Sequence, residues 1–533
     1  MGLIERIHSL PHKTKIFFEL LLLLVIIGIA VFLRFWQINS FPPGLYADVA
    51  ANGLDGLNLL RDGDFRIVYP RNAGREGMYY WYLALVMAVL GTNYVVNYIA
   101  TGIAGVLTVL ANYIFARKMF GRFVALASSF FLATSFFHMH YSRLGYRTIL
   151  VPIFVIITLY AVNYFLQNPS KRNALIAGVA STLGMYTYIS YRAVFFGLIL
   201  ALIWHFYWNR EQYKRIKPEL KRFGVGIGVG FIPFIVGAIL DPVAMFARSG
   251  SVLSIWTLPE NILRTAATFG IRGDHEMQYN IGLEPAVPLA LSIFFLYGIW
   301  HMYHNQKQRN SFTFAFLLLS IAAHLAIVAI TDRVPHMLRA SGMLTPVMIL
   351  AGIGLRAIII DLRKLKPNLA YIFILFLIPY LIYLPFRTYD LYFEGWVQQE
   401  NLARREFFTD YIALGNYLNE NDYNNPGVHI VSNWYQDGIG QRDSYILQTT
   451  NYIIKDSDPI YRIEYNDSFS YADSGTYIIR TDDGVAQKLF FERFPEAVLI
   501  DYIFEIPEYQ QDPDKRIEIF RVYNSGDANA PSS

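Results

Sequence analysis

Apolar runs of about twenty residues recur along the first 385 positions of this 533-residue chain. A run of about 20 apolar residues is long enough to cross the hydrocarbon core of a bilayer as a helix. The pattern therefore predicts a polytopic α-helical membrane protein with about eleven transmembrane helices. Their expected ranges are 16–36, 94–116, 123–139, 149–166, 174–189, 193–208, 223–240, 286–303, 312–331, 338–356 and 369–385.

The composition agrees with a membrane protein. The chain is 54% hydrophobic and 16% charged, whereas a soluble chain carries about 25% charged residues. The net charge of +4 gives no reason to expect a nucleic-acid partner, and the absence of cysteine excludes disulfides and thiolate metal sites. The first run, 16–36, is too long for a signal-peptide core and lacks a small-residue cleavage site, so we expect a retained anchor.

The distribution of basic residues predicts the topology. Lys and Arg in short loops stay in the cytoplasm, and here they gather at the N-terminus and at 117–122, 170–172, 209–222, 305–309 and 361–366. The apolar segment 78–91 has only about fourteen residues, and spanning there would move every later basic loop outside. We therefore interpret it as an interfacial or re-entrant helix. The N-terminus is then cytoplasmic and the C-terminus extracytoplasmic, in a prokaryotic plasma (inner) membrane.

The segments left outside include a first outer loop, 37–77, and a long outer loop, 241–285. The chain changes character after about residue 385, where polar helix-like runs alternate with short β-branched runs. This alternation predicts a small extracytoplasmic α/β domain over 386–533, with a disordered tail, "SGDANAPSS". The predicted membrane domain is 1–385.

Five arginines in the predicted outer loops oppose the positive-inside pattern. They are Arg143, Arg147, Arg192, Arg333 and Arg339. A membrane-embedded phosphate would require such residues, because the guanidinium fork matches phosphate geometry. For any single arginine, headgroup contacts or carboxylate pairing by snorkelling side chains are the favoured explanation. The set of five favours phosphate binding.

The first outer loop contains "FPPGLYADVAANGLDGLNLLRDGDF", residues 41–65. Residues 47–61 have the spacing of a short amphipathic helix, with Asp48, Asn52 and Asp55 on one face. Helix capping by Asp48 and solvation of Asp55 are the structural alternatives to a functional role. The "RDGD" segment indicates a turn at the end of the helix.

Two further charged segments lie outside the spans. Arg75 and Glu76 are expected at the start of the short interfacial helix, where charges are costly unless they are paired or functional; a carboxylate favoured by the helix dipole is the alternative. "GIRGDHEMQYN", 270–280, offers His and carboxylate side chains as metal ligands. With one histidine and no second anchor, a solvated turn is favoured there.

With these segments in order, the sequence resembles polytopic GT-C-type glycosyltransferases of the protein O-mannosyltransferase class (family 39), related to the lipid A aminoarabinose transferases. The resemblance rests on the first-loop segment, on "GREGMYYWYLALVMAVLG", on "ANYIFARKMFGRFVALASSFFLATSFFHMHYSRLGYRTILVPIF", and on "YTYISYRA" and "RVPHMLRASGMLTP". It covers about residues 1–360.

The resemblance implies an inverting transfer from a polyprenyl-phosphate-linked sugar to a hydroxyl of a protein, lipid or glycan. Asp48 corresponds to the general base, and Glu76 to a residue that orients the acceptor or a metal. The arginines carried over to the donor phosphate are Arg143, Arg147, Arg192 and Arg339. Support of the acceptor or of the loops falls to Asn52, Asp55, Arg75 and His336.

The sequence departs from this family in two places. Val49 follows Asp48 where many members have Glu, and Thr148 to Pro152 replaces a segment that often carries Asp. Both departures favour metal-independent chemistry with no cofactor, and a divalent cation is the alternative. A transporter or flippase of a lipid-linked or small polar substrate is the rival function. It predicts charges at mid-membrane on broken helices, whereas the predicted spans here are nearly free of charge.

Overall fold

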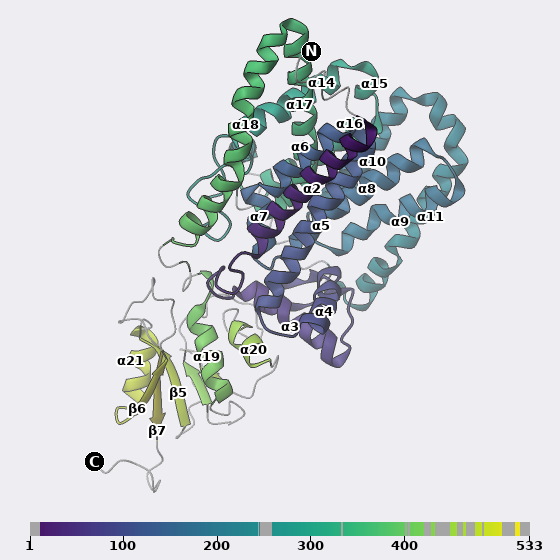
Figure 1. Ribbon diagram of the computed structural model, residues 1–533. Helices are drawn as coiled ribbons and strands as arrows, with labels where there is room; N and C mark the ends of the chain where they lie inside the picture. Colours follow the sequence, from purple (N-terminus) through teal and green to yellow (C-terminus); the bar gives the residue numbers. More distant parts are fainter. Residues whose placement is uncertain are drawn as a thin grey trace. The chain divides into compact units, whose positions relative to one another are not determined.

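The computed structural model describes residues 11–243, 245, 258–331, 334–399, 402, 406–420, 428–431, 448–455, 462–464, 475–481, 484–503 and 517–522 (Figure 1). The chain forms two compact units. The first comprises Met1–Ile38, Phe65–Tyr82 and Tyr98–Trp396, and the second comprises Asn39–Asp64, Leu83–Asn97 and Val397–Ser533. The second unit therefore includes most of the first outer loop as well as the C-terminal part.

The first unit is almost entirely helical. Its α-helices, in chain order, are α2 (His12–Phe35), α5 (Val95–Phe120, whose first turn belongs to the second unit), α6 (Arg122–Ala133), α7 (Phe136–Arg143), α8 (Leu150–Gln167), α9 (Lys171–Leu183), α10 (Tyr191–Trp208), α11 (Arg210–Leu240), α13 (Leu258–Ala267), α14 (Leu289–His304), α15 (Gln306–Arg309), α16 (Phe312–Ala329), α17 (Leu344–Leu365) and α18 (Pro367–Tyr389). The 3-10 turns η1 (Arg71–Ala73), η2 (Arg147–Ile149), η3 (Gly184–Tyr186) and η4 (Met337–Met343) and the π-helix η5 (Asp390–Trp396) complete it.

The helices confirm a multi-pass membrane protein, with fewer clear spans than predicted. In the described residues, eight helices are long and apolar enough to cross a membrane, or nine if the bent pair α6 and α7 is one span. All eleven predicted spans coincide with helices, but α9 has 13 residues and α14 has 16, which is short of the ~20 needed to span. The basic segment 209–222, expected as a loop, instead forms the first turns of α11.

The short apolar segment after the first outer loop forms α4, Met78–Leu90, and is too short to be counted among the spans. It begins in the first unit and ends in the second. Just before it, strand β2 (Arg75–Glu76) pairs antiparallel with β1 (Val68–Tyr69). Arg75 and Glu76 therefore precede the helix in a two-stranded ribbon, and the prediction that they start the helix is wrong by two residues.

The bend between α6 and α7 is 55°. A helix end leaves backbone carbonyls without intrahelical partners, and here other helices supply donors. Arg34 of α2 donates to the carbonyl of Ala133 at 3.2 Å, and the Thr388 hydroxyl of α18 donates to the carbonyl of Thr134 at 2.5 Å. Ser135 caps α7 by accepting from the backbone N–H of His138. The bend is thus fixed by hydrogen bonds from both sides.

The second unit contains the predicted α/β fold. Its five-stranded sheet has the order β4 (Arg462–Glu464), β3 (Val428–Val431), β5 (Gly475–Arg480), β7 (Ile517–Val522) and β6 (Val498–Ile503). The first three strands are parallel, and β7 is antiparallel to both of its neighbours. The expected disordered tail lies outside the described residues.

Helices cover both faces of this sheet. On one face, Leu414 and Leu418 of α19 (Thr409–Glu420) pack with Ile430, Ile478 and Ile519. On the other, α21 (Gly484–Arg493) packs Ala486 and Phe490 against Tyr477 and Phe520. Helices α20 (Gln448–Ile454) and α3 (Ala47–Asp62) also belong to this unit, together with the later part of α4. The predicted boundary near residue 385 stays a prediction.

Candidate functional site

Helix α3 carries the predicted catalytic base. It spans Ala47–Asp62 and ends at Gly63, whose φ of 69° suits glycine, close to the predicted 47–61. Asp48 is the second helical residue and the cap position belongs to Tyr46, so the capping alternative does not match the position of Asp48. Asp48 is half-buried, and Asn52 and Asp55 on the same face are buried. The alternative that Asp55 is merely solvated is therefore wrong.

Glu76 and Arg147 form a buried ion pair in the first unit. Nη1 of Arg147 lies 3.0 Å from Oε2 of Glu76, and the guanidinium also lies over the ring of Tyr188. Arg75 beside them donates to the carbonyl of Arg71 at 3.0 Å and lies over the ring of Tyr80. The expectation that charges here are paired is met. The Glu76 carboxylate holds an arginine that was itself a candidate for phosphate binding.

Arg143 is fully buried at the last position of α7. Its Nη1 and Nη2 donate to the carbonyls of Leu33, at 3.2 Å, and Trp36, at 2.9 Å, at the C-terminal end of α2. The rings of Tyr392 and Phe393 from η5 lie 4.8 and 4.9 Å from the guanidinium carbon. A positive charge at a helix C-terminus is favourable, so Arg143 has a structural role whatever else it binds.

Arg34 is a second fully buried arginine and was not among the residues predicted to form the site. Besides Ala133, it donates to the carbonyls of Ala30 and Leu132, and it bonds Nδ1 of His138 at 2.8 Å and the hydroxyl of Ser142 at 3.3 Å. None of these partners is a carboxylate. The available signal was an arginine inside an apolar run, which is rare unless it has a role.

Three segments from the predicted outer loops meet in the first unit. The Thr148 hydroxyl bonds the Ser341 hydroxyl at 2.6 Å. His336 is buried and stacks on Tyr279, which contacts the ring of Tyr146 at 5.9 Å. The structure thus brings together the segment that contains Arg143 and Arg147, the long loop with Tyr279, and the segment that contains Arg339.

Arg192, at the start of α10, and Arg339, in η4, are both partly buried. They are therefore more accessible than Arg143 and Arg147. The predicted candidate Arg333 lies outside the described residues.

Asp274 of the long loop is buried and connects two backbone segments. Its carboxylate accepts from the backbone N–H groups of Glu276 and Met337, both at 3.1 Å. Burial raises the pKa of Asp274, and these hydrogen bonds oppose the shift. The expected solvated turn is wrong for Asp274 and right for His275, which is 56% exposed. Within the described ranges, no three His, Asp or Glu side chains are grouped to hold a metal.

An apolar groove of about 840 Å³ runs between α2 and α18. Its walls include Val25, Gly28 and Phe32 of α2 and Ile382 and Phe386 of α18. Leu33 and Trp36, whose carbonyls accept from Arg143, also line it. Arg143 itself is fully buried and does not line the groove, so it lies behind the lining residues Leu33 and Trp36.

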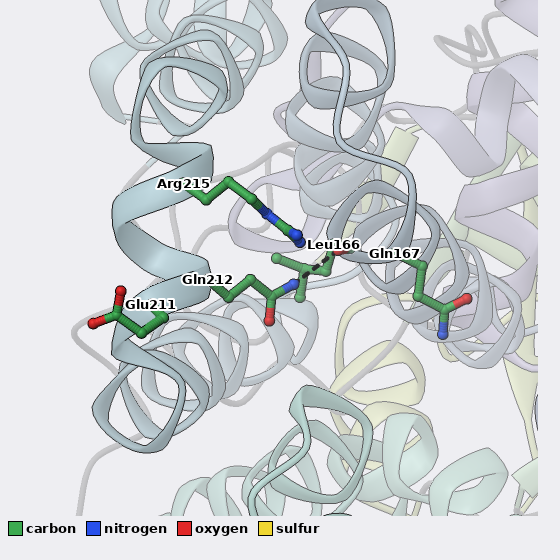
Figure 2. A pocket seen from close by; sticks show the side chains of 5 residues that line it. All are labelled: Leu166, Gln167, Glu211, Gln212 and Arg215. Atoms are coloured by element: carbon green, nitrogen blue, oxygen red, sulfur yellow. Dashed lines mark hydrogen bonds between the residues drawn. The ribbon is translucent and has the colours of Figure 1, made fainter.

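A second pocket, of about 650 Å³, is polar. Figure 2 shows Gln212 and Arg215 of α11 directed toward the end of α8, where the Gln212 amide donates to the carbonyl of Leu166 at 2.8 Å. Leu166, Gln167 and Glu211 complete the lining. None of the predicted site residues lies in this pocket, and its α11 side is the basic segment expected in the cytoplasm. It is therefore not part of the candidate site.

Comparison with known proteins agrees with the resemblance seen in the sequence. Residues 77–236 match the family model of dolichyl-phosphate-mannose-protein mannosyltransferases. No match was found among curated protein sequences.

Two solved structures share the fold. The crystal structure of ArnT from Cupriavidus metallidurans bound to undecaprenyl phosphate has a TM-score of 0.60 and 10% identity, covering 97% of this chain and 99% of that one. The oligosaccharyltransferase AglB from Archaeoglobus fulgidus, in complex with an inhibitory peptide and a dolichol-phosphate, has a TM-score of 0.53 and 13% identity, covering 84% of this chain and 65% of that one. The chain thus has the GT-C-type membrane fold, and the predicted resemblance to GT-C-type glycosyltransferases is confirmed.

Proposed function

Proceeding from a GT-C-type membrane fold, we propose that this chain is an inverting glycosyltransferase. It moves a sugar from a polyprenyl-phosphate donor to a hydroxyl acceptor at the outer membrane face. The observation that carries the proposal is the apolar groove between α2 and α18. Its apolar walls suit the isoprenoid tail of such a donor, and Arg143 lies buried behind two of its lining residues, Leu33 and Trp36.

The donor phosphate is assigned to the arginines of the first unit. Arg192 and Arg339, which are partly buried, are suited to direct contact, while Arg143 supplies buried positive charge and Arg147 is held in place by its ion pair with Glu76. Charge-assisted hydrogen bonds to phosphate are about twice as strong as neutral ones. In support, the ArnT structure is bound to undecaprenyl phosphate and the AglB structure is in complex with a dolichol-phosphate, both of which are polyprenyl phosphates.

The proposed chemistry is a single displacement. The Asp48 carboxylate takes the proton of the acceptor hydroxyl as its oxygen attacks the anomeric carbon of the sugar. The bond from that carbon to the phosphate oxygen breaks with inversion, and polyprenyl phosphate leaves with the electron pair. The arginines stabilise the charge that develops on the leaving phosphate.

The other predicted residues take supporting roles. Asn52 and Asp55 share the buried polar face of α3 with Asp48. Glu76 acts through Arg147, to which it is bonded, instead of orienting an acceptor or a metal. Arg75 and His336 fix the surrounding loops through Arg71 and Tyr279. The mechanism uses no metal or cofactor.

The proposed orientation follows the distribution of basic residues. The N-terminus and the basic connections lie in the cytoplasm, and the first outer loop, the long loop and the α/β part lie outside the plasma membrane. This side of the membrane suits a reaction between a lipid-borne donor and an acceptor that is reached from the water.

The test is a transfer assay with purified protein and a panel of polyprenyl-phosphate sugars. The account expects release of polyprenyl phosphate with at least one donor, and a glycoside product of inverted anomeric configuration by NMR. A retained configuration would contradict the mechanism. If no donor turns over and proteoliposomes instead show flux of the lipid-linked sugar, the transporter reading replaces the proposal.

A further inference from the structure

Helix α3 is attached at both ends to the C-terminal part within the second unit. Before its first turn, the Leu45 N–H donates to the carbonyl of Phe407 at 2.8 Å, and the Thr449 hydroxyl donates to the carbonyl of Leu45 at 3.1 Å. At its last turn, Arg61 donates to the carbonyl of Lys455 at 2.9 Å. Thr449 lies in the first turn of α20 and Lys455 follows its last residue, so the two ends of this one short helix reach the two ends of α3.

The middle of α3 is held by Tyr452 of α20. The ring of Tyr452 lies directly against Gly53, where a Cβ atom would overlap the ring. Tyr452 is 2% exposed, and its hydroxyl accepts a hydrogen bond from the Asn97 amide at 3.0 Å. The fit requires both a glycine on α3 and an aromatic ring on α20, and the hydroxyl fixes the ring at its far end.

The contact lies close to the proposed base. Asp48 and Gly53 are five residues apart on one helix, which corresponds to a rise of about 7.5 Å. Gly53 faces α20, whereas Asp48, Asn52 and Asp55 share a different face. A change in how Gly53 packs against Tyr452 would therefore tilt or rotate α3, and would move Asp48 without any direct contact with it.

The α20 helix is itself fixed to the sheet-covering helix α19. The Thr450 hydroxyl donates to the carbonyl of Tyr411 at 3.0 Å, and Gly415 of α19 closely approaches Ile453. Leu414 and Tyr411 of α19 belong to the apolar core of the α/β fold. A continuous packed path thus leads from the β-sheet through α19 and α20 to α3.

We propose that Tyr452 is a positioning residue of the transfer reaction, and that the C-terminal α/β part sets the placement of α3 through the Tyr452–Gly53 contact. This inference rests on the proposed function, in which Asp48 on α3 is the general base. Tyr452 touches neither the donor nor the acceptor in this account. Its loss is expected to lower kcat by about 10- to 100-fold, because small displacements of a catalytic group have effects of this size, and to leave the donor KM unchanged.

The experiment is a double-mutant cycle on the full-length protein, in which one residue of the contact is enlarged and the other is made smaller. The variants are Gly53→Ala, Tyr452→Leu and the double variant, with kcat, donor KM and amide hydrogen exchange of α3 as readouts. The added methyl clashes with the Tyr452 ring, and the smaller leucine relieves the clash. We expect each single variant to lose kcat and α3 protection, and the double variant to lose less than the product of the single losses.

The control is Tyr417→Leu, which alters an aromatic residue packed on the α19 side of the same core. It is expected to keep the wild-type kcat even if it lowers the melting temperature. Independent, multiplicative losses in the cycle, or an unchanged kcat and α3 exchange in Tyr452→Leu, would overturn the positioning role. A wild-type protein without turnover would instead overturn the proposed function, and the exchange readout separates the two failures.

Discussion

Arg147 and Glu76 are joined by a 3.0 Å ion pair across 71 residues of sequence, and both side chains are buried. The pair links the short ribbon before α4 to the 3-10 turn before α8. A buried ion pair is costly to assemble but more costly to break, since removing one partner leaves a bare buried charge. Glu76 is therefore better understood as the counterion of Arg147 than as a free carboxylate.

The first prediction follows from this pair. Glu76→Gln leaves Arg147 buried without a counterion and should destabilise the protein by about 3–5 kcal/mol. The double variant Glu76→Gln/Arg147→Met removes both charges and should recover much of that loss. The measurement is thermal unfolding in detergent. Glu260→Gln is the matched control, since the Glu260–Arg264 pair is exposed and should contribute at most about 1 kcal/mol. Equal effects of Glu76→Gln and Glu260→Gln would contradict the prediction.

The second prediction concerns the bend between α6 and α7. Arg34→Met removes the donors to the carbonyls of Leu132 and Ala133 and leaves these buried acceptors unsatisfied, at about 1–3 kcal/mol each. Since α7 ends at Arg143, a looser bend should also raise the donor KM. Arg34→Lys keeps the charge but cannot reach all the acceptors, and should fall between wild type and Arg34→Met. Wild-type melting temperature and KM in Arg34→Met would show that the bend does not need Arg34.

The third prediction tests the groove as the place of the isoprenoid tail. Gly28 lines the groove, and a Cβ atom at this position would meet no other atom within 4 Å, so Gly28→Leu directs a large side chain into the groove. The donor KM should rise about tenfold, which corresponds to about 1.4 kcal/mol of binding. The control is Gly228→Leu on α11, at a glycine with equally open surroundings outside the groove. An unchanged donor KM in Gly28→Leu would show that the isoprenoid tail does not bind in this groove.

The fourth prediction is a pH dependence at Asp274. Burial raises its pKa above the ordinary value of 3.8, so the folded protein holds this proton more tightly than the unfolded chain. Its contribution to stability is therefore complete below the ordinary value and is lost as the pH rises through the raised pKa.

Asp274→Asn has no such proton, so above pH 3.8, the ordinary pKa of the group, its melting temperature should depend less on pH than that of wild type. Identical slopes in wild type and Asp274→Asn would show that Asp274 does not titrate with folding.

Local features of the fold could be predicted from the sequence. The helix at 47–62 follows from the spacing of apolar residues and from the "RDGD" turn, and both signals lie within the segment itself. The span count was less accurate, because apolar content does not reveal where a helix such as α9 gives way to a 3-10 turn at Gly184.

Contacts between distant segments were not predictable in the same way. The pairing of Glu76 with Arg147 and the burial of Asp55 depend on tertiary packing. The contact between Gly53 and Tyr452 joins residues almost 400 positions apart, and no local pattern marks it. The sequence shows Arg34 as a charged residue in an apolar run. It does not show the acceptor of Arg34 at the end of α6, the Ala133 carbonyl, because the break between α6 and α7 is seen only in the folded structure.

The most direct test of the central claim compares Asp48→Asn with Asp62→Asn. Both changes remove one carboxylate from the same helix, and Asp62 is exposed at its far end. With a donor that the wild type accepts, the account predicts that Asp48→Asn loses transfer while remaining folded and inserted, and that Asp62→Asn retains it. Transfer at the wild-type rate in Asp48→Asn would contradict the assignment of Asp48 as the general base.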